Sequence, residues 1–266
     1  MKSLAIITFI LIIGIVSFLI FKWYRANEII YNYNPAKHRS ENFSNTLPYR
    51  YFIPAIESNK KYPLMVYLHS ASGRGTNNRK QLEQAAIFYS SIPFQKQLPM
   101  FVLAPQCPTG TQWLNTKFPN LPYVLYNQDA IPESPIMKQT MTLIKEFIKQ
   151  HPIDTSRIYI SGFSMGSSGS WDIITRYPGT FAAAILISGT KDTSKTSLAS
   201  NTSFWLFHGS NDKICSPMTT QSAAKALIEI GADCKINLYE AGHNCVKETL
   251  QEPELISWLM SKSLKH

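Results

Sequence analysis

One serine stands between two glycines in a pattern that suits nucleophilic catalysis. Gly162-Phe163-Ser164-Met165-Gly166 follows the predicted strand 157–161 and precedes a segment predicted to be helical from Met165 to about Tyr177. A sharp turn from strand to helix lifts a serine hydroxyl clear of a sheet, and glycines leave room for that turn. A Gly-x-Ser-x-Gly pentapeptide occurs by chance in roughly one chain in ten of this length, with Gly and Ser each near ~7%. The motif therefore gains weight only if catalytic partners exist.

Two partners follow in the order serine, acid, histidine. Asp212 lies in a short loop after the predicted strand 204–208, and His243 lies in the loop after the predicted strand 235–240. We predict that His243 takes the proton of Ser164 and that Asp212 holds the imidazole in the required tautomer. Taken singly, Asp212 could be a turn residue and His243 a surface histidine, but three suitable residues at three strand ends favour a catalytic triad.

The other histidines are assigned structural or solvated positions. His69 and His208 each end a predicted strand, and we expect their rings to hold loop backbone. His38, His151 and His266 fall outside the predicted sheet and are expected at the surface.

Stabilisation of a developing oxyanion needs two backbone N–H groups. Met165, at the start of the helix after Ser164, is one predicted donor. The second is expected from the small-residue loop after Leu68, where Ser70 and Ala71 remain alternatives. Arg74 in the same loop is a candidate substrate contact, with a solvated surface position as the alternative.

The remaining pattern alternates predicted strands with predicted helices. Strands are expected at 47–56, 62–68, 100–104, 157–161, 183–188, 204–208 and 235–240, and helices at 80–90, 134–150, 165–177, 216–230 and 254–264. This alternation predicts an α/β fold with a mostly parallel, doubly wound sheet and helices on both faces. Ligands of such sheets bind beyond the carboxyl ends of the strands, where all three candidate triad residues lie.

The segment 107–133 interrupts the alternation. It is rich in proline, asparagine and aromatic residues, and it contains Trp113, a candidate substrate contact. Loops of this length are often lids or binding loops. An ordered loop packed by its own aromatic side chains is an equal alternative.

Together these motifs resemble the esterase and predicted-peptidase branch of the α/β hydrolases, which is related to feruloyl esterases, polyhydroxybutyrate depolymerases and prolyl-oligopeptidase-like domains. The matching stretches are Leu-His-Ser-Ala-Ser-Gly-Arg-Gly-Thr-Asn-Asn (68–78), Ala-Pro-Gln-Cys-Pro (104–108), Asp-Thr-Ser-Arg-Ile-Tyr (154–159), Gly-Phe-Ser-Met-Gly (162–166), Ser-Trp-Asp (170–172), Arg-Tyr-Pro (176–178), His-Gly-Ser-Asn-Asp (208–212) and Ala-Gly-His-Asn (241–244). The resemblance implies an α/β-hydrolase fold and the triad Ser164, Asp212 and His243. Family members usually have glycine where this chain has Ser70 and Ser167, and a side chain at Ser70 is expected to narrow the oxyanion loop.

The N-terminus is predicted to lie outside the catalytic domain. Residues 4–21 form a run of 18 uncharged residues, long enough for a membrane span. We therefore predict an anchor or signal segment at 1–26, a linker at 27–45 and a catalytic domain at 46–266. A membrane-anchored or exported protein of the cell envelope, periplasm or extracellular space is expected, with its sidedness open.

Charge and cysteine content add further expectations. The formal net charge is +9, and residues 1–39 carry five basic residues against one acid, so the excess outside them is thinly spread. The sequence has no cluster of basic residues of the kind that indicates nucleic-acid binding. Cys215 and Cys245 lie close after Asp212 and His243, which raises the hypothesis of a disulfide between the two loops; small buried hydrophobic residues are the alternative. No cysteine and histidine spacing suggests a metal site, and no cofactor motif is present.

These observations predict a serine esterase acting on a small-molecule or polysaccharide-linked ester. A serine peptidase with the same triad is one alternative. The other is a catalytically silent hydrolase-fold module that binds a partner at the cell envelope.

Overall fold

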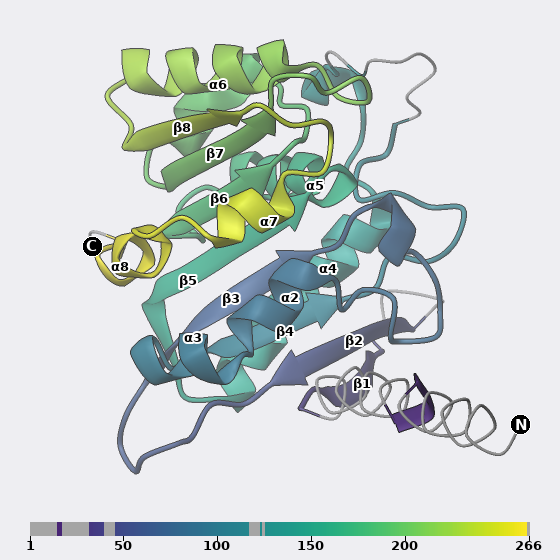
Figure 1. Ribbon diagram of the computed structural model, residues 1–266, viewed down its shortest axis with the longest axis vertical. Helices are drawn as coiled ribbons and strands as arrows, with labels where there is room; N and C mark the ends of the chain where they lie inside the picture. Colours follow the sequence, from purple (N-terminus) through teal and green to yellow (C-terminus); the bar gives the residue numbers. More distant parts are fainter. Residues whose placement is uncertain (1–14, 18–31, 40–45, 117–122, 124–125, 265–266) are drawn as a thin grey trace, which may run out of the picture.

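Eight strands form a single sheet in the order β1-β2-β4-β3-β5-β6-β7-β8 (Figure 1). The computed structural model describes residues 15–17, 32–39, 46–116, 123 and 126–264. The strands are β1 (Asn34–His38), β2 (Leu47–Phe52), β3 (Tyr62–Leu68), β4 (Phe101–Pro105), β5 (Ile153–Phe163), β6 (Ala183–Ile187), β7 (Ser203–Gly209) and β8 (Cys234–Tyr239). β1, β2 and β4 pair in antiparallel fashion, and every other neighbouring pair is parallel.

Helices cover both faces of the sheet. Apolar side chains of α4 (Pro135–Gln150), α5 (Met165–Arg176) and α6 (Pro217–Glu229) pack in one core. The second core, on the opposite face, includes side chains of α2 (Gln84–Tyr89), α3 (Ile92–Gln97), α7 (Val246–Leu250) and α8 (Leu255–Met260). Every residue of β3, β4 and β6 is buried, which explains their near-continuous apolar sequences. The predicted α/β architecture is confirmed.

Local sequence explains where the helices begin. The Ser134 hydroxyl accepts a hydrogen bond from the amide of Met137, and Pro135 occupies the first turn of α4, as expected for a serine cap followed by proline. Ser216 and Pro217 begin α6 in the same sequence pattern, but the Ser216 side chain makes no capping hydrogen bond.

Several predicted boundaries were wrong. The stretch 27–45, predicted as a linker, contains β1, which pairs with β2 along its whole length. His38 ends β1, is buried and lies 3.0 Å from a carboxylate oxygen of Glu146, so it is not a surface histidine. The predicted helix 80–90 begins only at Gln84, and α3 and α7 were not predicted. Each has only five or six residues, too few for a clear hydrophobic period.

The predicted anchor at 1–26 and the membrane segment 4–21 lie outside the described residues, apart from 15–17. Among the residues that the structure does describe, no helix has both the length and the apolar character needed to cross a membrane.

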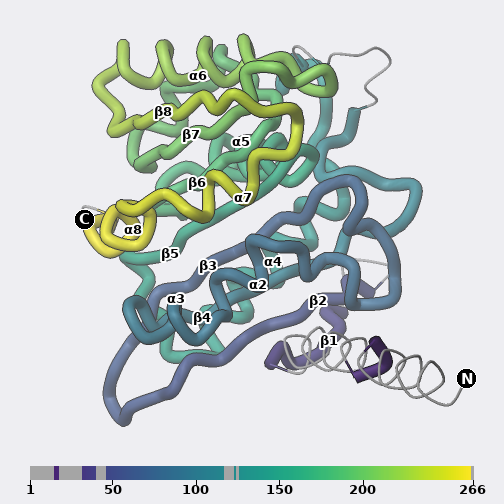
Figure 2. Tube along the Cα trace, in the orientation of Figure 1, coloured from purple at the N-terminus to yellow at the C-terminus, as the bar shows by residue number. Residues whose placement is uncertain are grey.

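The sheet brings the candidate residues together. Figure 2 shows the turns that follow β5, β7 and β8 gathered at one edge of the sheet. These turns carry Ser164, Asp212 and His243.

Candidate active site

Ser164 occupies a sharp turn between β5 and α5. Its backbone has φ 55° and ψ −117°, a conformation that costs a residue with a side chain on the order of 1–3 kcal/mol. The amide of Ser164 donates to the carbonyl of Ile187 at the end of β6, at 2.8 Å. The strained turn is thus anchored to the neighbouring strand, as expected for a nucleophile presented above a sheet.

Gly166 allows α5 to begin against the end of β3. A Cβ atom at this position would lie 1.8 Å from the carbonyl oxygen of Leu68. Any side chain there would therefore push the serine turn away from the loop that follows β3.

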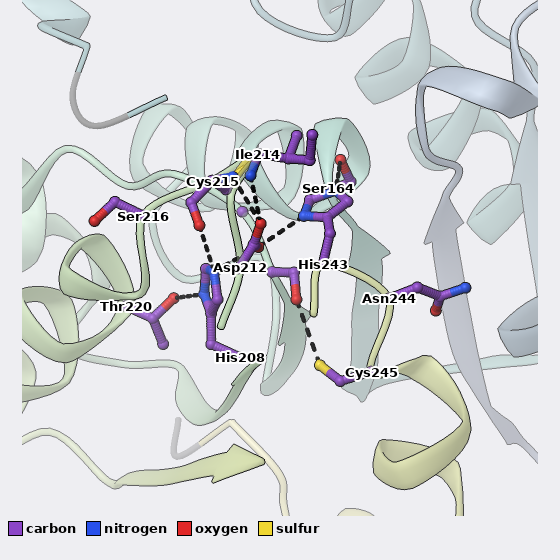
Figure 3. Close-up of polar contacts among 12 residues, drawn as sticks. Ser164, His208, Asp212, Ile214, Cys215, Ser216, Thr220, His243, Asn244 and Cys245 are labelled. Atoms are coloured by element: carbon purple, nitrogen blue, oxygen red, sulfur yellow. Dashed lines mark hydrogen bonds and ion pairs between the residues drawn. The ribbon is translucent and has the colours of Figure 1, made fainter. Parts of the chain in front are cut away.

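Ser164, His243 and Asp212 form a continuous hydrogen-bonded array (Figure 3). His243 Nε2 lies 2.8 Å from Ser164 Oγ, and His243 Nδ1 lies 2.7 Å from Asp212 Oδ2. The Asp212 side chain is fully buried, whereas the His243 side chain is 21% exposed. The buried acid and the accessible serine and histidine have the geometry of a Ser-His-Asp triad.

The loop after β7 keeps the acid charged. Burial alone would raise the pKa of the Asp212 carboxyl, but hydrogen bonds from His243 and from the amides of Ile214 and Cys215 lower it below its ordinary value. The two amides lie 2.7 and 3.0 Å from Asp212 Oδ1. Asp212 is thus held as a carboxylate that can stabilise an imidazolium.

The acid and histidine loops are bound to each other through their backbones. The amide of Ser210 donates to Tyr239 at 2.8 Å, and that of Asn211 donates to Ala241 at 3.0 Å. Gly209 lies so close to the histidine loop that a Cβ atom there would be 1.9 Å from the carbonyl oxygen of Gly242. This close approach sets the spacing between Asp212 and His243.

The structure separates the two alternatives for the oxyanion loop. The Ser70 amide donates to Glu83 Oε2 at 3.0 Å, and its hydroxyl donates to Glu83 Oε1 at 2.6 Å. Both the amide and the hydroxyl of Ser70 are therefore engaged by Glu83, which disfavours Ser70 as the oxyanion donor. Ala71 and Met165 both line the pocket at Ser164 and remain the candidate pair of donors.

A small pocket of about 210 Å³ opens at Ser164. It is lined by Ala71, Arg74, Gln112, Tyr123, Ser164, Met165, Ser168, Thr190, Ile214 and Cys215. The hydroxyls of Ser168 and Thr190 lie 3.0 Å apart in its wall. A second hollow of about 380 Å³ is lined by Phe163 and Asn244, next to the triad, and by Ser70 and Glu83. A hollow of about 490 Å³ near Ser203 and Asp233 lies at the amino ends of β7 and β8, away from the triad.

Comparison with known proteins agrees with this geometry. Residues 121–256 match the phospholipase/carboxylesterase family, and this range includes Ser164, Asp212 and His243. The chain belongs to the phospholipase/carboxylesterase family.

Individual members and neighbours are similar over different shares of their length. A protein of Oryza sativa subsp. japonica named "Probable carboxylesterase" is 31% identical over an alignment of 142 residues, which covers 46% of this chain and 60% of that protein. The crystal structure of a thermostable esterase superposes with a TM-score of 0.79 at 32% identity, over 88% of this chain and 64% of that one. An acylaminoacyl peptidase of Pyrococcus horikoshii shares the fold, with a TM-score of 0.59 at 15% identity over 88% of this chain and 42% of that one. This chain thus spans less than two thirds of each of these proteins.

Of the two predicted substrate contacts, one is buried. Trp113 is fully buried, and its indole Nε1 donates to the carbonyl of His69 at 2.9 Å. It supports the loop after β3 and cannot touch a substrate, so this prediction was wrong. Arg74 lines the pocket, and its Nε lies 3.3 Å from Met165 Sδ, which leaves its role as a substrate contact a prediction.

The predicted disulfide is absent, since Cys215 and Cys245 are both free. Cys245 Sγ lies 3.4 Å from Ser188 Oγ and belongs to the core beneath α7, whereas Cys215 borders the catalytic pocket. Burial raises the pKa of the Cys215 thiol to about 12. Both cysteines are therefore small buried residues, which is the alternative to a disulfide that the sequence left open.

The two strand-end histidines hold loop backbone, as predicted. His69 Nε2 accepts from the amide of Cys107 at 2.9 Å, and the ring of His208 lies 3.0 Å from the carbonyl oxygen of Cys215.

Two further residues were missed. Glu83 holds the oxyanion loop, and Lys191 is fully buried behind the acid loop. Neither stands in a motif: Glu83 is revealed by its hydrogen bonds to Tyr67, Ser70 and Ser72, and Lys191 by its burial in the fold. In the described part of the chain, no group of three or more histidine, cysteine or acidic residues could hold a metal ion.

Proposed function

We propose that this protein hydrolyses carboxylic esters through an acyl-enzyme on Ser164. The observation that carries this proposal is the array in which His243 lies 2.8 Å from Ser164 Oγ and 2.7 Å from Asp212 Oδ2. Membership in the phospholipase/carboxylesterase family supports the same reaction.

In the first step, Ser164 Oγ attacks the ester carbonyl carbon while His243 Nε2 takes the hydroxyl proton. The carbonyl oxygen becomes an oxyanion, and we assign its stabilisation to the amides of Met165 and Ala71, two residues that line the pocket at Ser164. Collapse of this intermediate breaks the bond to the alcohol oxygen, and His243 returns the proton to that oxygen. Asp212 stays ionised and stabilises the transient imidazolium.

In the second step, water attacks the acyl-enzyme. His243 Nε2 takes a proton from the water, and the same two amides hold the second oxyanion. Collapse expels Ser164 Oγ, which regains its proton from His243. The products are a carboxylic acid and free enzyme.

The pockets suggest how a substrate lies. At about 210 Å³, the pocket beside Met165 is smaller than the roughly 300–1,000 Å³ typical of sites for drug-sized ligands. A short acyl chain fits it. The alcohol must lie near His243, which protonates it, so the hollow beside Asn244 is assigned to the alcohol of a small-molecule or polysaccharide-linked ester.

The test compares the full chain with its Ser164→Ala variant on p-nitrophenyl acetate, butyrate and octanoate. We expect hydrolysis of the short esters, weaker hydrolysis of octanoate, and loss of all three activities in the variant. Labelling by a fluorophosphonate reports the nucleophile independently of the ester chosen. A folded parent without hydrolysis or labelling would contradict the proposal and favour the silent binding module.

Amide analogues of the same acyl groups separate an esterase from a peptidase, since both use the same triad chemistry. We expect ester turnover to exceed amide turnover. Preferential amide cleavage would assign the site to a peptidase.

We also propose that the protein is anchored at or exported to the cell envelope. The 18-residue uncharged run at 4–21 supports this localisation. Fractionation of cells that express the full chain tests it, because recovery with cytosolic proteins only would contradict it.

A further inference from the structure

A chain of buried polar side chains continues from Asp212 on the side away from Ser164 (Figure 3). His208 Nε2 lies 3.0 Å from Asp212 Oδ2 and 3.0 Å from the carbonyl oxygen of Cys215. His208 Nδ1 lies 2.7 Å from Thr220 Oγ1. Lys191 Nζ lies 2.9 Å from Thr220 Oγ1 and 2.8 Å from the carbonyl oxygen of Gly189. His208, Thr220 and Lys191 are all fully buried.

The contacts fix which atoms carry protons. Both partners of His208 Nε2 are acceptors, so this nitrogen carries the ring proton. Burial and the neighbouring Lys191 charge lower the pKa of His208 to about 4, so the ring is neutral near pH 7 and its Nδ1 accepts. Thr220 must then donate its hydroxyl proton to Nδ1, and its oxygen accepts from Lys191.

Two buried or half-buried thiols, Cys215 and Cys234, act on the Lys191 ammonium group at the end of this series of hydrogen bonds. Burial lowers the pKa of Lys191 to about 7, and burial raises that of the Cys215 thiol to about 12. In either of its protonation states, Lys191 can donate to both of its acceptors. The direction of the chain from Lys191 through Thr220 and His208 to Asp212 is therefore the same throughout the neutral range.

We propose that Lys191, Thr220 and His208 are positioning residues that orient the acid of the triad. This inference rests on the proposed function. His208 donates to Asp212 Oδ2, the same oxygen atom that accepts from His243 Nδ1. Four donors then surround the carboxylate, two on each oxygen, and prevent its rotation. Thr220 and Lys191 hold His208 in the one tautomer that can make this donation.

The hydrogen bond from His208 also affects how strongly Asp212 stabilises the protonated form of His243. A second donor on Oδ2 withdraws electron density from the oxygen that contacts the catalytic imidazole. Removal of this donor makes Oδ2 more basic, which stabilises the His243 imidazolium. The acidic limb of the pH profile of kcat/KM then moves to higher pH, while the looser carboxylate lowers kcat.

Thr220→Val and Thr219→Val provide a matched pair. Both threonines are buried neighbours in α6, but the Thr219 hydroxyl lies 2.9 Å from the carbonyl oxygen of Ser216 and 3.3 Å from that of Gly189. No hydrogen bond joins it to His208, so its removal leaves the contact between Thr220 and His208 in place. We expect Thr220→Val to lower kcat about tenfold with little change in KM, as the loss of one buried hydrogen bond would do. Its acidic limb should move to higher pH. Thr219→Val should show neither change.

His208→Gln and His208→Met test the donor itself. Glutamine retains an N–H group that can reach Asp212, whereas methionine has a similar length without a donor. We expect a loss in kcat on the order of 10²-fold for His208→Met and substantial retention for His208→Gln. Thermal unfolding of both variants identifies one that has lost its fold, in which case the threonine pair decides.

A readout independent of turnover separates this inference from the proposed function. NMR titration of the full chain follows its six histidine rings, with His243 assigned from its missing signal in His243→Gln. We expect the His243 ring to titrate at higher pH in Thr220→Val than in Thr219→Val, whether or not an ester is hydrolysed. Identical titrations and identical pH profiles in the two variants would overturn the positioning role. A parent without esterase activity but with the expected titration shift would overturn the proposed function alone.

Discussion

Asp212 is the residue on which the precision of the site depends. Its Oδ1 accepts from the backbone amides of Ile214 and Cys215, and its Oδ2 lies within 3.0 Å of both histidine rings. All four of these partners donate to the carboxylate, so a donor group placed at the same position would find no acceptor among them. This arrangement gives a sharp prediction for an amide at the same position.

Asp212→Asn should lower kcat on the order of 10⁴-fold without unfolding the protein. The amide oxygen would stay with the two backbone amides, which places the NH₂ group against His243 Nδ1. That group donates, so His243 would carry its proton on Nε2 and could not accept from Ser164. Steady-state kinetics on a p-nitrophenyl ester measures the loss. Activity within tenfold of the parent would contradict the assignment of the acid.

Glu83 acts one step further from the chemistry. It accepts from the Tyr67 hydroxyl, the Ser70 amide and the Ser70 and Ser72 hydroxyls, and these contacts hold the loop that carries Ala71. Glu83→Ala should lower kcat by about 10²-fold, the effect of a misplaced oxyanion donor. Glu83→Gln retains an oxygen for Tyr67 and the Ser70 amide, so it should keep most of the activity. Equal losses in the two variants would contradict a role that depends on these acceptors.

At the residue scale, the sequence could predict which three residues come into hydrogen-bond contact, because each lies in the turn after a strand with a recognisable apolar pattern. The sequence could not decide whether Ser70 or Ala71 is the second oxyanion donor, since that choice depends on the hydrogen bond between the Ser70 amide and the Glu83 carboxylate. It misplaced Trp113 for a related reason. An aromatic residue in a long loop can face either solvent or the core. Trp113 faces the core, where its indole donates to the carbonyl of His69, a residue 44 positions away in the sequence.

At the scale of elements, the catalytic geometry depends on how closely three loops pack. Gly209 makes the closest approach between the acid and histidine loops, with the position of its absent Cβ 1.9 Å from the Gly242 carbonyl oxygen. A methyl group there must move one loop. Because His243 directly follows Gly242, such a movement separates the imidazole from Asp212.

Gly209→Ala should therefore lose most activity and destabilise the protein by a few kcal/mol, roughly the cost of forced overpacking. Gly242→Ala is its matched control, because no atom lies within 4 Å of the Cβ that it would add. We expect Gly242→Ala to keep its melting temperature and most of its turnover. Tolerance of Gly209→Ala in both assays would show that the loops have more room than the backbone contact implies.

Long elements could be predicted from the sequence and short ones could not. The buried parallel strands have continuous apolar runs, and α4 has both a serine cap and 16 residues of helical pattern. In contrast, β1 has the sequence Asn-Pro-Ala-Lys-His, and it is a strand because β2 offers it an edge. Its formation depends on pairing between segments, which local propensity does not report.

At the scale of the whole molecule, two buried histidines link stability to pH. Burial lowers the pKa of His69 to about 4, and burial with the Lys191 charge lowers that of His208 to about 4, from an ordinary value of 6.5. Between pH 6.5 and 4 the unfolded chain binds protons at these positions and the folded chain does not. The free energy of unfolding must then fall as the pH falls through this range.

Each histidine contributes at most about 1.4 kcal/mol per pH unit within the range. Lys191, whose pKa burial lowers to about 7, is protonated in both states through most of it and adds little to the slope. Asp212, whose pKa is below its ordinary value, contributes only at lower pH. Urea unfolding at pH 7, 6 and 5 should show the decline, and His208→Gln should reduce its slope by about half. A free energy of unfolding that stays constant from pH 7 to 5 would contradict neutral histidines at these two strand ends. Because the same rings hold the oxyanion loop and the acid loop, acid should release both sides of the active site together.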